Sequence, residues 1–141
     1  YNVTNLGRSH ELLLAPAYAE IVEKHLRDAS GVASEFLGRE IDLVARVREQ
    51  RETSLESYGD AVALVVAMEL AQLELLATFF DIAPKHARFS FGYSLGEITA
   101  LVASGVLNAR AALEIPLKLA DDCAALAHGV TLGILFSRGP E

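Results

Sequence analysis

The 141-residue chain contains no tryptophan, one methionine and one cysteine, Cys123. A lone cysteine cannot form a disulfide within the chain, which is typical of proteins from a reducing compartment. Because Cys123 lies among alanines in a helical pattern, we expect a buried, unreactive thiol. The sequence does not open with a basic and apolar leader, so we expect a cytoplasmic protein.

Long apolar runs and an excess of basic residues are also missing. The longest apolar run, residues 61–73, is interrupted by Glu69 and is shorter than a membrane-spanning helix requires. Acidic residues outnumber basic ones by 19 to 12, for a net charge of −7, and the two signs are interspersed. These absences argue against a membrane protein and against a nucleic-acid partner.

The sequence does contain enough apolar material for a packed core. Hydrophobic residues make up 52% of the chain, which excludes a disordered protein. A chain of this length forms one domain, or a large part of one, and buries about 70% of its unfolded surface. The apolar fraction is high for a lone small domain, so we expect part of it to face a missing subdomain or a partner subunit.

Apolar residues recur at helical spacing along most of the chain. The expected helices cover residues 16–30, 41–47, 60–80, 95–105 and 109–127. We expect the first to end at Ser30 and Gly31, Asn108 to cap the last, and Pro116 to kink that last helix. Two short runs, residues 87–91 (ARFSF) and 130–137 (VTLGILFS), are predicted strands. The alternation of helices and strands predicts an α/β fold with a parallel sheet flanked by helices.

Three arginines, Arg46, Arg48 and Arg51, lie in the most charged part of the chain. Glutamates are interspersed with them, so we interpret this segment as a solvated, self-paired surface; the alternative is an anion-binding patch.

Residues 92–96, Gly-Tyr-Ser-Leu-Gly, match the pattern G-x-S-x-G between an expected strand and an expected helix. A serine on a sharp strand-to-helix turn, called a nucleophile elbow, is typical of a catalytic nucleophile. The positions two residues before and after it must be small for the turn to close, as Gly92 and Gly96 are. The backbone N–H of Leu95 then lies at a helix N-terminus, where it stabilises an oxyanion. We interpret Ser94 as the nucleophile; the simpler alternative is a serine N-cap between two unrelated glycines.

A serine hydroxyl needs an adjacent base before it attacks a carbonyl carbon. The four histidines are His10, His25, His86 and His128. None of their sequence positions marks a histidine as the base for Ser94. Within these 141 residues the nucleophile is therefore predicted without its partner.

The segment GYSLGEITALVASGVL, residues 92–107, resembles the GHSxGE…ALxxSGxL signature of malonyl-CoA:acyl carrier protein transacylases and of polyketide synthase acyltransferase domains. The resemblance covers essentially the whole chain, although the family's domain is about twice as long. It implies that residues 1–141 are the N-terminal portion of one acyltransferase-like domain. Its large subdomain is α/β-hydrolase-like, and the small ferredoxin-like subdomain is absent or only begins near residue 130.

The resemblance implies acyl transfer in fatty-acid or polyketide biosynthesis. An acyl group would pass from coenzyme A to Ser94 as an ester, and then to the phosphopantetheine thiol of an acyl carrier protein. No metal and no covalently bound cofactor is implied. The family's base is a histidine well after the elbow, beyond residue 141. We therefore expect either that a longer chain or a partner subunit supplies it, or that Ser94 lacks its normal base.

Three positions depart from the family pattern. Tyr93 stands where the family has histidine, at a position that touches the acyl pocket. The family's N-terminal GQGSQ loop does not occur in these residues, so the second oxyanion-hole N–H would come from about Tyr1 or Asn2; the alternative is a loop that lies partly upstream. The carboxylate-binding arginine, counted without gaps from the elbow, falls on Leu119. Because leucine cannot pair with a carboxylate, we expect a transferase that does not select malonyl groups.

Two other functions stay open on the sequence. The first is a catalytically inactive acyltransferase-like module that binds a carrier protein or docks in an assembly. The second is a serine esterase of α/β-hydrolase type that uses the same elbow.

Overall fold

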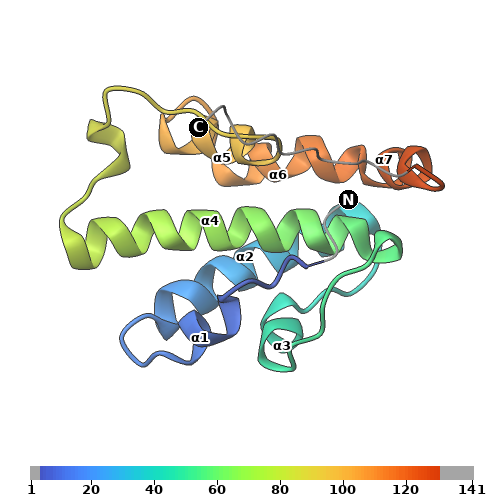
Figure 1. Ribbon diagram of the computed structural model, residues 1–141, viewed down its shortest axis with the longest axis horizontal. Helices are drawn as coiled ribbons and strands as arrows, with labels where there is room; N and C mark the ends of the chain where they lie inside the picture. The colour runs from blue at the N-terminus through green and yellow to red at the C-terminus, as the bar shows by residue number, and fades with distance from the viewer. Residues whose placement is uncertain (1–3, 131–141) are drawn as a thin grey trace, which may run out of the picture.

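Helix α4 (Tyr58–Phe80) is the central element of the protein, with helices above and below it in the view of Figure 1. The helices on one side are α1 (Ser9–Leu14), α2 (Ala19–Leu37) and α3 (Leu43–Arg48). Those on the other side are α5 (Gly96–Ala103), α6 (Ala109–Lys118) and α7 (Ala120–Ala127). Single 3-10 turns at Leu55–Ser57 and Pro84–His86 precede and follow α4. The structure, a computed structural model, describes residues 4–130.

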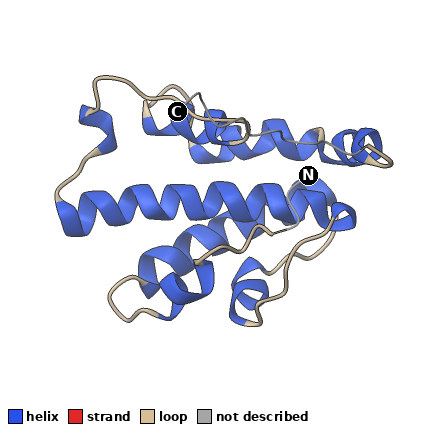
Figure 2. Ribbon diagram, in the orientation of Figure 1, coloured by secondary structure: helices blue, strands red, loops and turns tan. Residues whose placement is uncertain are grey.

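The predicted α/β fold is wrong: within residues 4–130 every regular element is a helix, and no strand is present (Figure 2). Residues 87–91 form a loop, in which Phe89 is 86% and Phe91 is 91% exposed. A β-strand exists only where a neighbouring strand accepts and donates its backbone hydrogen bonds, and residues 4–130 provide no such neighbour. The second predicted strand, residues 130–137, lies outside the described residues apart from Val130.

The core forms mainly between α2 and α4. α2 buries Val22, Leu26, Ala29 and Ala33, which lie on one face at spacings of four, three and four residues. α4 is apolar nearly all round, and its first three turns are almost wholly buried. The small alanines allow the two helix axes to approach closely, and α6 then packs against both helices. The long helix predicted over residues 60–80 is confirmed.

α2 continues beyond its predicted end. We expected Ser30 and Gly31 to end the helix, but it runs on to Leu37, and Gly38, with φ 64°, is its left-handed C-cap. The Ser30 hydroxyl donates to the Leu26 carbonyl at 2.7 Å and accepts from the backbone N–H of Leu43 at 3.0 Å. Ser30 therefore joins α2 to α3 instead of ending the helix.

A buried carboxylate fixes the start of α4. Asp60 is 2% exposed, and its carboxylate accepts hydrogen bonds from Arg46 of α3, at 2.7 Å, and from Arg39. Arg46 also donates to the backbone carbonyl of Glu52 at 3.0 Å. A charge this deeply buried is stable only when it is paired, so Asp60 holds α3 and the preceding loop against α4.

The last predicted helix is two helices. Asn108 caps α6 as expected, since its side chain accepts from the N–H of Ala111 at 2.9 Å. Pro116 lies inside α6 and cannot donate the hydrogen bond that an ordinary residue would make to the preceding turn. The helix is interrupted at Leu119, one turn later, where φ is −101° and ψ is 1°. Cys123, expected to be buried, is exposed, because Ala120 is the buried residue of α7.

The segment Leu55–Phe80 is long and apolar enough to cross a membrane, by length and composition alone. The apolar run noted in the sequence, residues 61–73, is shorter than a membrane span, but the segment that contains it is long enough. In the protein, 44% of its most apolar window is buried among the other helices. The central helix of a soluble protein meets the same criterion, so the cytoplasmic location stays a prediction.

Candidate functional site

Ser94 lies in a tight turn that leads into α5, and its backbone is left-handed, with φ 55°. The N–H of Gly96 donates to the carbonyl of Tyr93 at 3.0 Å, and the N–H of Glu97 donates to the carbonyl of Ser94 at 3.1 Å. A left-handed conformation is costly for a residue with a β-carbon, and single residues of this kind are frequent at functional sites.

Ser94 does not cap the helix that follows it. The N-cap position of α5 is Leu95, and no side chain accepts from the first α5 amides. The Ser94 side chain is exposed. The Leu95 side chain packs against the hydrophobic core and anchors the turn. The structure therefore presents the Ser94 hydroxyl to solvent on an anchored turn.

The two glycines that flank Ser94 have different surroundings. A β-carbon on Gly92 would lie 2.0 Å from the backbone carbon and oxygen of Gly96, so no side chain fits at position 92. A β-carbon on Gly96 would meet only the Glu69 carboxylate, at 3.5 Å, which is an ordinary contact. The turn closes on itself at Gly92, and this close approach brings Ser94 to its tip.

The backbone N–H of Leu95 is free to bind a ligand. Among residues 4–130 no acceptor for it is found, whereas the next three amides are bonded within the turn. It lies at the N-terminus of α5, where the helix dipole favours negative charge. Chemically, the turn presents an exposed hydroxyl and an adjacent donor suited to an oxyanion.

A cavity of about 370 Å³, here called the elbow cavity, lies beside this turn. Gly92, Tyr93 and Gly96 contribute to its wall from the turn. The rest of the lining comes from α4, α5 and the loop before Ser94: Glu69, Leu73, Ser90, Phe91, Thr99, Ala100 and Ala103. Thr99 is buried, and its hydroxyl donates to the Glu69 carboxylate. Ser94 is not part of the lining, so the turn places its hydroxyl outside the cavity wall.

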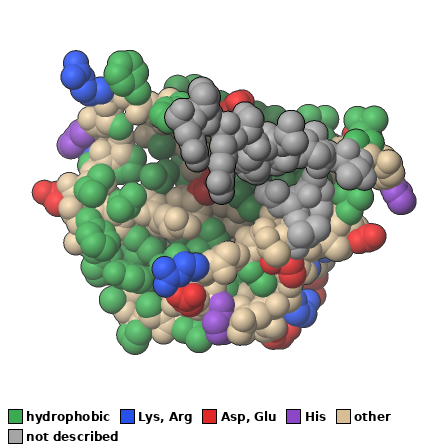
Figure 3. Space-filling view, viewed as in Figure 1, with side chains coloured by type: hydrophobic (Ala, Val, Ile, Leu, Met, Phe, Trp, Pro, Cys, Tyr) green, Lys and Arg blue, Asp and Glu red, His purple; other side chains and the backbone are tan. Residues whose placement is uncertain are grey.

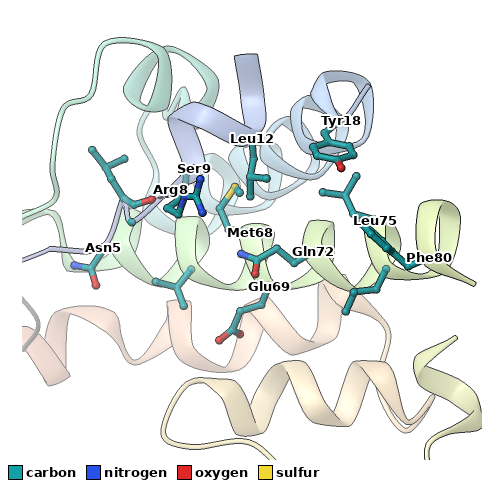
Figure 4. Close-up of a pocket in the computed structure, with 14 residues that line it drawn as sticks. Asn5, Arg8, Ser9, Leu12, Tyr18, Met68, Glu69, Gln72, Leu75 and Phe80 are labelled. Atoms are coloured by element: carbon teal, nitrogen blue, oxygen red, sulfur yellow. Dashed lines mark hydrogen bonds between the residues drawn. The ribbon is translucent and has the colours of Figure 1, made fainter. Parts of the chain in front are cut away.

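A larger cavity, of about 710 Å³, lies along α4 (Figure 4). Asn5, Arg8 and Ser9 lie at one end of it, and Tyr18, Leu75 and Phe80 lie at the other. Glu69 projects from α4 toward the side on which α5 and α6 run (Figure 4). Glu69 lines both cavities.

The apolar residues at the C-terminal end of α4 are left partly uncovered. Figure 3 shows hydrophobic side chains gathered over this end of the helix. The exposed ones are Leu76, Phe79, Phe80 and Ile82. Further along the loop to α5, Phe89, Phe91 and Tyr93 are at least 86% exposed.

None of the four histidines is hydrogen-bonded to Ser94 in the part of the chain that the structure describes. The Nδ1 atom of His10 lies 3.1 Å from the carbonyl oxygen of Val47, and the Nε2 atom of His25 lies 2.6 Å from the Glu74 carboxylate. His86 and His128 are exposed. His86 belongs to the 3-10 turn after α4, and His128 directly follows α7.

The remaining predicted site residues are not all brought together. Tyr93 lines the elbow cavity, with a side chain that is 92% exposed. Leu119 lies at the junction of α6 and α7, is 51% exposed and lines neither cavity. Asn2 lies outside the described residues.

Sequence reasoning missed Glu69 as a site residue. The available signal was its position, because it interrupts the longest apolar run of the chain. A charged residue inside such a run faces either solvent or a polar partner, and the partner, Thr99, is distant in sequence.

The three clustered arginines do not form a free anion site. Each is paired with a carboxylate: Arg46 with Asp60, Arg48 with Glu23 and Arg51 with Glu49. Among the residues that the structure describes, no group of three or more potential metal ligands is found.

Comparison of the chain with known protein families, with curated proteins and with solved structures finds no match.

Proposed function

We propose that Ser94 accepts an acyl group from an acyl-coenzyme A and passes it to the phosphopantetheine thiol of an acyl carrier protein. The observation that supports this most directly is the left-handed Ser94 at the tip of a closed turn. Its hydroxyl is exposed, the free N–H of Leu95 is next to it, and a cavity adjoins the turn. The resemblance of residues 92–107 to acyltransferase elbows supports the same chemistry.

In the first half-reaction, the Ser94 oxygen bonds to the thioester carbonyl carbon and loses its proton to a base. The carbonyl oxygen becomes an oxyanion, which the Leu95 N–H stabilises; one such donor contributes about 2.7–4 kcal/mol to a transition state. The carbon–sulfur bond then breaks, and the departing thiolate takes a proton. In the second half-reaction the carrier thiol gives its proton to the base and its sulfur bonds to the ester carbon. The bond between that carbon and the Ser94 oxygen then breaks, and the serine oxygen takes the proton back from the base.

The base in this proposal comes from outside residues 4–130, from another segment or a partner subunit. The exposed position of the Ser94 hydroxyl leaves room for a histidine to approach it. A base within hydrogen-bonding distance is what raises the nucleophilicity of a serine.

The test is acylation measured by intact mass. The protein is incubated with acetyl-, butyryl- and malonyl-coenzyme A, each alone and with a carrier protein. We expect an adduct of one acyl mass that disappears in Ser94→Ala and persists in Ser104→Ala, an exposed serine at the end of α5. Transfer to the carrier protein completes the cycle. An adduct that survives Ser94→Ala contradicts the proposal, and so does the absence of an adduct with any thioester when the segment or subunit that carries the base is present.

A second candidate is a binding module that holds a carrier protein or partner without chemistry. The highly exposed Phe89, Phe91 and Tyr93 favour it, because aromatic side chains in this position provide an apolar contact surface. Carrier binding that Ser94→Ala leaves unchanged, together with no acyl adduct, is the result that supports this candidate.

A further inference from the structure

Within the described part of the chain, Glu69, on α4, is the one residue of the elbow-cavity wall that carries a charge; apart from Tyr93, whose phenol is neutral, no other lining residue has an ionisable side chain. No lysine, arginine or histidine contributes to this wall within residues 4–130. The cavity therefore contains a negative charge and no described cation that offsets it.

The Glu69 carboxylate is held in place and still has a free oxygen. Its Oε2 atom accepts from the Thr99 hydroxyl, and Thr99 is buried. Its Oε1 atom lies 3.5 Å from the position of a β-carbon on Gly96, and no described residue donates to it. The free oxygen is thus directed at the start of α5, two residues beyond Ser94.

The rest of the described wall carries no charge and combines the aliphatic Leu73, Ala100 and Ala103 with aromatic side chains, two hydroxyl side chains and two glycines. The cavity as a whole has a volume of about 370 Å³, which is large enough for an acyl chain of several carbons. An apolar chain gains free energy by leaving water for such a wall. A carboxylated acyl group would instead bring a second negative charge next to Glu69 in a partly desolvated space.

We infer that Glu69 determines acyl specificity: the elbow cavity takes uncharged acyl groups and rejects carboxylated ones, such as malonyl or succinyl. This inference rests on the proposed acyl transfer for its biological meaning, but it concerns a cavity and can be tested by binding alone. It does not depend on Leu119, which does not line the elbow cavity. Glu69 acts here by charge repulsion and is not a catalytic residue.

The test compares two thioesters of equal chain length, butyryl-coenzyme A and succinyl-coenzyme A, which differ by a terminal carboxylate. Dissociation constants are measured by calorimetry on the full chain with Ser94→Ala, so that no acylation intervenes. We expect butyryl-coenzyme A to bind at least about tenfold more tightly than succinyl-coenzyme A. In Ser94→Ala/Glu69→Gln the ratio should fall to about one, because glutamine keeps the acceptor for Thr99 and removes the charge.

The matched control is Glu74→Gln, which neutralises another carboxylate of α4, one that pairs with His25 and does not line the elbow cavity. It should leave the tenfold ratio unchanged, and circular dichroism checks that every variant keeps its helices. Equal affinity for the two thioesters, a preference that survives Glu69→Gln, or binding of neither thioester overturns the inference. Discrimination without any acylation of the parent protein supports the inference and contradicts the proposed transfer.

Discussion

The hydroxyl of Thr99 on α5 donates a hydrogen bond to the carboxylate of Glu69 on α4. This bond joins the helix that follows Ser94 to the central helix of the protein. Because Thr99 is buried, its hydroxyl has little access to water as an alternative partner.

Thr99→Val should lower the free energy of unfolding by about 1.5 kcal/mol, because it removes a hydrogen bond to a charged group and keeps the shape of the side chain. Thr78→Val, at an exposed threonine of the same α4 helix as Glu69, should change it by less than about 0.5 kcal/mol. Urea unfolding of Thr99→Val, Glu69→Ala and the double variant gives the coupling energy, expected at about 1 kcal/mol. A coupling of zero would show that the bond does not stabilise the fold.

Gly92→Ala should be far more damaging than Gly96→Ala. The added methyl group at position 92 would lie 2.0 Å from backbone atoms, so the turn must open, at a cost of about 1–3 kcal/mol. At position 96 the nearest atom is 3.5 Å away, and alanine favours the helix, so stability should stay equal or rise. Thermal unfolding followed by helical circular dichroism compares the two variants, and equal losses would be inconsistent with the closed turn.

Ser94→Gly should stabilise the protein while it removes the hydroxyl. Glycine adopts a φ of 55° without strain, whereas a residue with a β-carbon is strained there by about 1–2 kcal/mol. Glycine is also more flexible in the unfolded chain, which offsets part of the relieved strain. The free energy of unfolding should therefore be higher than that of Ser94→Ala by up to about 1 kcal/mol. The measurement is the unfolding midpoint of both variants at the same pH. A Ser94→Gly protein less stable than Ser94→Ala would show that position 94 is not left-handed in solution.

Glu52 should make stability depend on pH. Burial alone would raise the pKa of the Glu52 carboxyl, but hydrogen bonds from the backbone amides of Thr53, Asn5 and Leu6 outweigh burial and hold the pKa below its ordinary value of 4.5. A carboxyl whose pKa is lower in the folded state stabilises the protein above the unfolded-state pKa. This contribution is lost as the pH falls through the lower, folded-state pKa.

We therefore expect the free energy of unfolding to be independent of Glu52 ionisation above about pH 5.5 and to decrease below pH 4.5 as the carboxyl gains a proton. Denaturant unfolding between pH 3 and pH 7 measures the dependence. Glu52→Gln should remove the contribution of Glu52 to the decrease in the free energy of unfolding at low pH. Glu40→Gln, at an exposed glutamate, should leave that decrease unchanged. Identical curves for the parent and Glu52→Gln would contradict this account.

The sequence predicted helices correctly where only neighbouring residues determine them. The apolar perimeter of residues 60–80 predicted a buried helix, and the amide side chain of Asn108 predicted an N-cap; both are confirmed. The end of α2 did not follow, because Ser30 looked like a terminator in sequence. Its hydroxyl instead bonds to α3, which only the folded chain brings near.

The strand predicted at residues 87–91, which is a loop in the structure, shows why the predicted fold class is wrong. Alternating apolar residues are compatible with a strand, but a strand also requires a neighbour to complete its hydrogen bonds. Residues 4–130 contain no such neighbour, so Phe89 and Phe91 stay in an exposed loop.

The sequence by itself determined the tight turn around Ser94, because glycine at position 92 and a helix-forming segment after position 95 are local properties of the chain. Only the tertiary structure decided what surrounds that serine. It brought Glu69, from a helix distant in sequence, to the wall beside the turn and carried Leu119 away from it. Local conformation depends on a few adjacent residues, whereas the charge and shape of a site depend on which helices pack together.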